Sequence, residues 1–206
     1  MPPSSGDQNL ISYRTLRRLV GILGVALPIV LAVWGFALRG ALQIEPSISD
    51  YYALRTRDAL VGILFTMAWF LFTYRAYERN DEIAGKTACL AALGVALFPN
   101  SGTPAESRIH FASAAVLFVT LACFSLFLFT KSQGVRTPQK RIRNGIYRGC
   151  GITILMCIAL IGLYKGTAMG TSLGAWQPVF WLESLALWAF GVSWFIKGET
   201  LFRDPA

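Results

Sequence analysis

One carboxylate lies inside a long apolar run of the sequence. Glu183 falls in the second turn of the run 178–196 and is the only acidic residue embedded in any such run. An acidic residue such as Asp at the centre of a membrane helix costs about 2.5–3.5 kcal/mol, and such residues usually face the bundle interior and have a partner. Two interpretations stay open. Glu183 binds a ligand, a proton or a metal, or it is a structural carboxylate hydrogen-bonded near the outer headgroups.

The single histidine, His110, begins another apolar run, and Asp58 begins a third. Ser113 lies on the same helix face as His110, because residues three apart are neighbours on a helix. An imidazole with two carboxylates can hold a divalent metal or act in acid–base chemistry, which makes Asp58, His110 and Glu183 candidate metal ligands. The competing interpretation, a lone interfacial histidine beside unrelated charges, is the one we favour.

Tyr51, Arg55 and Asp58 lie just before the run 59–74 and are separated by four and three residues. On a helix these spacings place all three side chains on one face. Arginine is a forked donor suited to phosphate and carboxylate, so this face could bind an anionic lipid headgroup or a carboxylate ligand. The alternative is an interfacial helix start whose charges pair with each other.

These residues must be positioned by membrane helices. The chain has 206 residues, of which 54% are hydrophobic and 15% charged, whereas a soluble domain has about 25% charged residues. Apolar runs of about 18 residues or more with few charges indicate spanning helices. We therefore expect an all-α multi-pass protein with one transmembrane domain at 17–197 and short tails at 1–16 and 198–206. Its six spans are expected at 19–38, 59–74, 84–98, 109–130, 146–164 and 178–196.

The positions of Lys and Arg predict the orientation of these spans. Most of the 19 Lys and Arg residues lie in the two termini, in the connection between the second and third spans, and in that between the fourth and fifth. Short cytoplasmic segments carry the excess of Lys and Arg, so both termini are expected in the cytoplasm of a bacterial inner-membrane protein. The second, fourth and sixth spans then begin at the outer surface. This topology places Asp58, His110 and Glu183 at a similar depth there.

Tyr and Trp residues near the ends of the runs are expected to form two aromatic belts at the membrane surfaces. The outer belt would contain Tyr51, Tyr52, Tyr164, Trp176 and Trp181. The inner belt would contain Tyr74, Tyr77, Tyr147 and Trp194.

Several short motifs resemble those of known membrane families. The chain has Ala-Ala-Leu-Gly-Val-Ala-Leu-Phe-Pro at 91–99, His-Phe-Ala-Ser-Ala-Ala at 110–115, and Ser-Asp-Tyr-Tyr at 49–52. With these motifs it resembles bacterial six-span families of unknown function, which are distantly similar to the DRAM/Sfk-like membrane proteins. The resemblance implies six helices and no particular activity. A comparison with the superfamily of alkaline ceramidases and progestin/adiponectin receptors fits less well, because its zinc hydrolases use three histidines and this chain has one.

The sequence favours a non-enzymatic membrane protein with a polar pocket near the outer leaflet that binds a lipid headgroup or a small ligand. The candidate lining is Tyr51, Arg55, Asp58, His110, Ser113 and Glu183. No cofactor is expected, and the oligomeric state is left open. The expected partners are membrane lipids and not nucleic acid, because no basic stripe with interleaved aromatics occurs. Two alternatives remain: a membrane-embedded lipid hydrolase that uses a metal or a general base at Asp58, His110 and Glu183, and a proton-coupled transporter in which Glu183 titrates.

Overall fold

The computed structural model describes residues 13–40, 43–74, 79–131, 137–167 and 174–198, and these residues contain helices but no strand. The long helices are α1 (Tyr13–Arg39), α2 (Arg57–Phe72), α3 (Arg79–Leu97), α4 (Pro104–Cys123), α5 (Pro138–Gly166) and α7 (Pro178–Lys197). Shorter elements are the 3-10 helices η2 (Ser49–Ala53) and η4 (Gly174–Trp176) and the π-helical turn η3 (Phe124–Leu128). Residues 13–16, predicted as part of the N-terminal tail, belong to α1.

Proline and threonine mark the starts of three long helices. Pro104, Pro138 and Pro178 occupy the first turn of α4, α5 and α7, where a missing N–H is no loss. Thr103 accepts a hydrogen bond from the Glu106 N–H, and the Glu106 carboxylate accepts one from the Thr103 N–H in return. This reciprocal capping satisfies backbone donors that the first turn of α4 leaves without helical partners.

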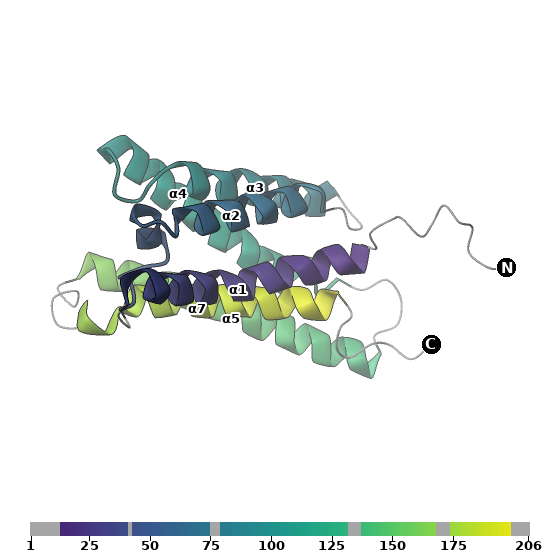
Figure 1. Ribbon diagram of the computed structural model, residues 1–206. Helices are drawn as coiled ribbons and strands as arrows, with labels where there is room; N and C mark the ends of the chain where they lie inside the picture. The colour runs from purple at the N-terminus through teal and green to yellow at the C-terminus, as the bar shows by residue number, and fades with distance from the viewer. Residues whose placement is uncertain (1–12, 41–42, 75–78, 132–136, 168–173, 199–206) are drawn as a thin grey trace.

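The long helices pack as two layers of three, which Figure 1 shows along their length. In one layer α7 lies between α1 and α5, and in the other α3 lies between α2 and α4. Contacts between α1 and α2 and between α4 and α5 join the layers into a closed ring of neighbours. The connections that the structure describes are short, so sequence neighbours become antiparallel spatial neighbours.

The described ends of the chain meet at one end of this bundle. Arg17 donates a hydrogen bond to the Lys197 carbonyl at 3.4 Å, and Arg18 donates one to the Gly198 carbonyl at 3.3 Å. Figure 1 shows the start of α1 and the end of α7 at this end of the bundle. We call the opposite end, where α1 finishes and α2, α4 and α7 begin, the distal end.

Four helical segments are long and apolar enough to cross a membrane: Arg14–Arg39, Pro104–Leu128, Pro138–Gly166 and Gly174–Lys197. The protein is therefore an all-α membrane protein. Each of the six segments predicted as spans coincides with a helix of the structure. However, α2 has 16 residues, which at about 1.5 Å per residue is shorter than a hydrocarbon core of about 30 Å. The other shorter helix, α3, starts with four polar residues at 79–82.

Small residues allow α1 and α7 to approach closely. A Cβ atom added to Gly191 would lie 2.6 Å from a Val25 methyl carbon and 2.8 Å from the Gly21 carbonyl oxygen. A Cβ atom on Gly21 would lie 2.9 Å from the Gly191 carbonyl oxygen. Membrane helices, which gain little from excluding water from each other, associate through such close backbone packing.

The prediction of an inner aromatic belt is wrong for the residues that the structure describes. Tyr74, Tyr147 and Trp194 are at most 2% exposed and lie in the core. The centroid of the Tyr74 ring lies 5.2 Å from the ring centroid of Phe124 and 5.1 Å from that of Trp194. Edge-to-face contacts of this kind stabilise a packed aromatic cluster. Tyr77 lies outside the described residues.

Of the residues predicted for the outer belt, two are exposed, Tyr164 is half-buried and two are buried. Trp176 and Trp181 are 76% and 48% exposed at the distal end, as expected of interfacial residues. Tyr51 and Tyr52, by contrast, are buried. Their side chains take part in contacts that join neighbouring segments.

We predict that Gly191→Ala lowers the free energy of unfolding by about 1–3 kcal/mol, because the new methyl group overpacks the crossing of α1 and α7. The matched control is Gly149→Ala in α5, where an added Cβ meets nothing within 4 Å. Thermal melting of the two variants in the same detergent measures the difference. Equal melting temperatures would show that this crossing tolerates a methyl group.

Candidate functional site

The predicted site residues lie around the segment that joins α1 to α2. We call residues 43–56 of this segment the connector; it includes η2 and lies at the distal end (Figure 1). Most of the connector is not helical, so its backbone N–H and C=O groups need partners from elsewhere in the protein. These partners come from α7 and from within the connector itself, while α4 contacts a connector side chain.

Glu183 joins the connector to α7. Its Oε2 atom accepts a hydrogen bond from the Ile48 N–H at 2.7 Å. One turn earlier on α7, the Phe180 N–H donates to the Pro46 carbonyl at 3.1 Å. The carboxylate that stood out in the sequence therefore binds a backbone N–H group of the connector, so it has a structural partner.

His110 joins the connector to the second layer of helices. Its side chain is 1% exposed, with Nδ1 at 2.7 Å from the Phe98 carbonyl oxygen and Nε2 at 2.9 Å from the Ser49 Oγ atom. A carbonyl oxygen only accepts hydrogen bonds, so Nδ1 carries a hydrogen, while Nε2 shares a hydrogen bond with the Ser49 hydroxyl, which can both donate and accept. Both ring nitrogens are thus engaged within the protein.

Asp50, which the sequence analysis did not single out, connects the same segments. Its carboxylate accepts hydrogen bonds from the Ser47 hydroxyl at 2.7 Å and from the Asn100 amide at 2.6 Å. The Asp50 N–H in turn donates to the Ser47 Oγ atom. The spacing of Ser47 and Asp50 is that of a capping box, a signal present in the sequence.

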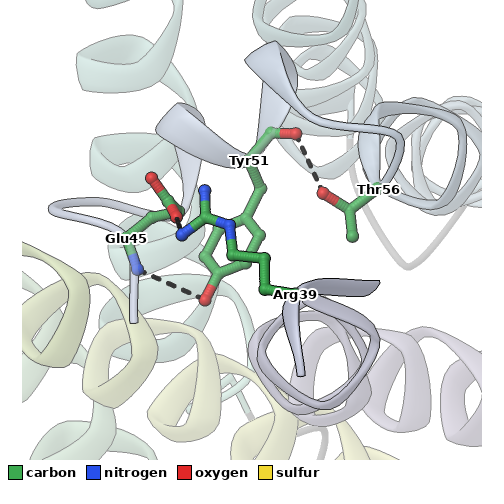
Figure 2. Close-up of polar contacts among 4 residues, drawn as sticks. All are labelled: Arg39, Glu45, Tyr51 and Thr56. Atoms are coloured by element: carbon green, nitrogen blue, oxygen red, sulfur yellow. Dashed lines mark hydrogen bonds and ion pairs between the residues drawn. The ribbon is translucent and has the colours of Figure 1, made fainter. Parts of the chain in front are cut away.

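Tyr51 is enclosed by polar contacts that Figure 2 shows. Its hydroxyl oxygen accepts from the Glu45 N–H at 3.4 Å, and its carbonyl accepts from the Thr56 hydroxyl at 3.0 Å. Arg39, at the end of α1, forms an ion pair with the Glu45 carboxylate. Burial of the ring raises the pKa of Tyr51, which keeps the phenol neutral in this position. Tyr51 therefore contacts both ends of the connector, and the pair of Arg39 with Glu45 joins the connector to α1.

Three predicted lining residues are not part of these contacts. Arg55 and Asp58 are exposed, in the turn before α2 and in its first turn. Ser113 lies instead at the crossing of α3 and α4, where a Cβ atom on Gly94 would be 2.2 Å from its hydroxyl oxygen. The structure brings His110 and Glu183 to adjacent residues of the connector but does not add Asp58, Arg55 or Ser113 to them.

The three candidate metal ligands, Asp58, His110 and Glu183, do not form a ligand set. Among the described residues no group of three or more His, Cys, Asp or Glu side chains could hold a metal ion. The polar atoms of His110 and Glu183 bind the connector instead. The arrangement does not supply the metal centre of the hydrolase alternative.

A pocket of ≈ 310 Å³ opens at the distal end between the connector, the end of α5 and the start of α7. Ser47 and Asp50 lie on its connector wall, and Lys165 and Tyr164 lie on its α5 wall. The exposed Lys165 ammonium also lies 5.5 Å from the centre of the Phe111 ring. An anionic and a cationic side chain therefore line the same pocket, and sequence reasoning did not identify either of them.

Comparison of the chain with protein-family models, with curated proteins and with solved structures gives no match.

We predict that Glu183→Leu lowers the free energy of unfolding by about 1–3 kcal/mol, because it leaves the Ile48 N–H without its acceptor. Glu183→Gln retains a carbonyl oxygen that can accept this hydrogen bond, so its loss should be smaller. Exposed Asp58→Asn should change stability by less than about 0.5 kcal/mol. Melting curves in one detergent rank the three variants. A Leu variant as stable as the Gln variant would remove the structural role of this contact.

Proposed function

We propose that the chain is a six-span protein of the bacterial inner membrane, with both termini in the cytoplasm and the distal end outside. The proposal is supported by the packing of α2 and α3 beside α1 and α4, which are long enough to span. It is also supported by the gathering of Lys and Arg in the termini and in two connections on the same side. In this topology the connector and the 310 Å³ pocket face the outer headgroups.

The second part of the proposal concerns this pocket. It binds a small zwitterionic group, either the headgroup of an aminophospholipid or a soluble zwitterion of the same chemistry. The observation that carries this proposal is the presence of Asp50 and Lys165 on the walls of one pocket. An ammonium group of the ligand would face Asp50, and its phosphate or carboxylate would face Lys165, so the opposite charges would orient the ligand.

The buried polar residues give this pocket its shape. Asp50 is fixed by Ser47 and Asn100. The segment that carries it is attached to α7 through Glu183 and to α4 through His110. A binding group held in one position by its neighbours loses less conformational entropy when a ligand arrives. His110 and Glu183 thus act as positioning residues, and the ligand itself would meet Asp50 and Lys165.

We expect two engineered cysteines to lie on opposite sides of the membrane. Ser101→Cys lies in the exposed connection between α3 and α4, and Gln139→Cys lies in the first turn of α5. The native cysteines, all within helices, are first replaced by alanine. A membrane-impermeant thiol reagent added to intact cells should label position 101 and reach position 139 only after lysis. Labelling of position 139 in intact cells would reverse the orientation.

We also predict that Lys165→Gln weakens binding of a zwitterion by about tenfold, the effect of losing about 1.4 kcal/mol from one charge-assisted contact. The probes are phosphatidylethanolamine in nanodiscs and soluble glycerophosphoethanolamine, compared with diacylglycerol and glycerol, respectively, which lack the charged headgroup. The control is Lys86→Gln, since Lys86 is exposed on α3 and pairs with Glu82 away from the pocket. Affinity is measured by calorimetry or by the shift in melting temperature.

The two probes separate the sources of the ligand. A Lys165-dependent response to the lipid alone identifies a headgroup site, and the same response to the soluble compound identifies a small-molecule site. Equal affinities for the wild type, Lys165→Gln and Lys86→Gln proteins would contradict the proposed pocket function.

A further inference from the structure

A second pocket at the distal end has a different lining and a different charge. Its volume is ≈ 210 Å³, and it lies between the last turn of α1 and the turn that precedes α2. Its walls are Gly35, Leu38, Arg39, Leu54 and Arg55. It shares no lining residue with the pocket that contains Asp50 and Lys165. An inference about it therefore does not depend on the proposed function.

The apolar part of this pocket continues along α1. A Cβ atom added to Gly35 would lie 2.9 Å from the Tyr51 ring, so the ring packs directly on the backbone of α1 beside the pocket. Leu38 is 45% exposed, and Trp34, one turn earlier on the same face, is 42% exposed. A strip of exposed apolar surface thus leads from the pocket toward the middle of a membrane-spanning helix.

Two arginines supply the polar part. Arg39 uses its Nη1 atom to pair with Glu45, and a guanidinium has five N–H donors, so the same side chain can also bind a second anion. Arg55 is exposed and has no ion pair within the described part of the chain. The two arginines outnumber the one carboxylate, so Arg39, Arg55 and Glu45 together have a positive formal charge.

Arginine at this depth suits a particular chemistry. Arg39 occupies the last turn of α1, and the end of a membrane-spanning helix lies at the level of the lipid headgroups. The planar fork of a guanidinium matches the oxygens of a phosphate group, and charge-assisted hydrogen bonds of this kind are stronger than neutral ones. An acyl chain attached to such a phosphate could then lie on the exposed strip of Trp34 and Leu38.

We propose that the pocket between Arg39 and Arg55 is a phosphate-binding site that holds the headgroup of an anionic phospholipid. Arg39 and Arg55 bind the phosphate oxygens from two sides. Gly35, Leu38 and Leu54 receive the glycerol and the first carbons of the acyl chain. The site would attach the connector and the end of α1 to the lipid.

The chain offers a matched pair of variants for the test. Arg55→Gln removes a guanidinium from the pocket without disturbing a contact that the structure gives it. The control is Arg57→Gln, since Arg57 is also exposed and is two residues away. Its guanidinium lies 4.5 Å from the Tyr52 ring centre and donates to the Tyr52 hydroxyl, outside the pocket. Arg55→Lys retains the charge and loses the fork.

The experiment titrates purified protein in detergent with phosphatidylglycerol, with phosphatidylcholine and with inorganic phosphate, and it follows the melting temperature and bound lipid by native mass spectrometry. We expect phosphatidylglycerol to raise the melting temperature of the wild type and of Arg57→Gln. Arg55→Gln should weaken this binding by about tenfold, equivalent to about 1.4 kcal/mol. Arg55→Lys should lie between the two.

Each outcome decides the proposal or identifies the source of the phosphate. Dependence on Arg55 with phosphatidylglycerol alone supports a lipid site, and the same dependence with inorganic phosphate supports a phosphate site open to soluble anions. The proposal is overturned if Arg55→Gln and Arg57→Gln respond alike, or if phosphatidylcholine binds as tightly as phosphatidylglycerol. The Lys165→Gln variant should leave phosphatidylglycerol binding unchanged, which keeps this result separate from that of the first pocket.

Discussion

The distal end depends on one constraint: a buried backbone that is not helical must find its hydrogen-bond partners inside the protein. The connector meets this constraint with backbone partners from α7, and α4 adds a contact to one of its side chains. Glu183 accepts from the Ile48 N–H, the Phe180 N–H donates to Pro46, and His110 binds Ser49. Since a buried polar group without a hydrogen-bond partner costs several kcal/mol, these contacts explain why polar or charged residues occur near the starts of α4 and α7. They also hold the two helical layers together at this end.

The same constraint determines which side chains can meet a ligand. The carboxylate of Glu183 and the imidazole of His110 are occupied by the connector, while Lys165 and Arg55 remain exposed beside pockets. A search of the sequence for unusual residues therefore finds the structural residues Glu183 and His110. It does not find Lys165, which is exposed beside a pocket. Where the sequence predicted one polar region, the structure has two separate pockets beside the connector, with different charges.

Much of the fold could be predicted from the sequence, because hydrophobic run length and helix-start residues act locally. The six predicted segments coincide with helices, and Pro178 begins α7 as expected. The common depth of His110 and Glu183 followed from chain direction alone. The hydrogen-bond partner of Glu183 could not be predicted in this way, because the Ile48 N–H lies 135 residues before Glu183 in a segment without periodicity. The prediction that Tyr51, Arg55 and Asp58 share one helix face is wrong for a related reason. The 3-10 helix η2 ends at Ala53 and α2 begins at Arg57, so no continuous helix contains all three.

The aromatic residues show where residue type stops being informative. Tyr and Trp near the ends of spans can lie at the lipid surface or pack with each other, and both choices satisfy their amphipathic rings. Trp176 is exposed, whereas Tyr74 and Trp194 are buried and pack with each other. What distinguishes them is the presence of facing helices: Trp194 on α7 lies against rings from η3 and from the end of the α2 segment, whereas Trp176 precedes α7. Only the three-dimensional order of the helices carries that information, and that order also brings Arg39 of α1 beside Arg55.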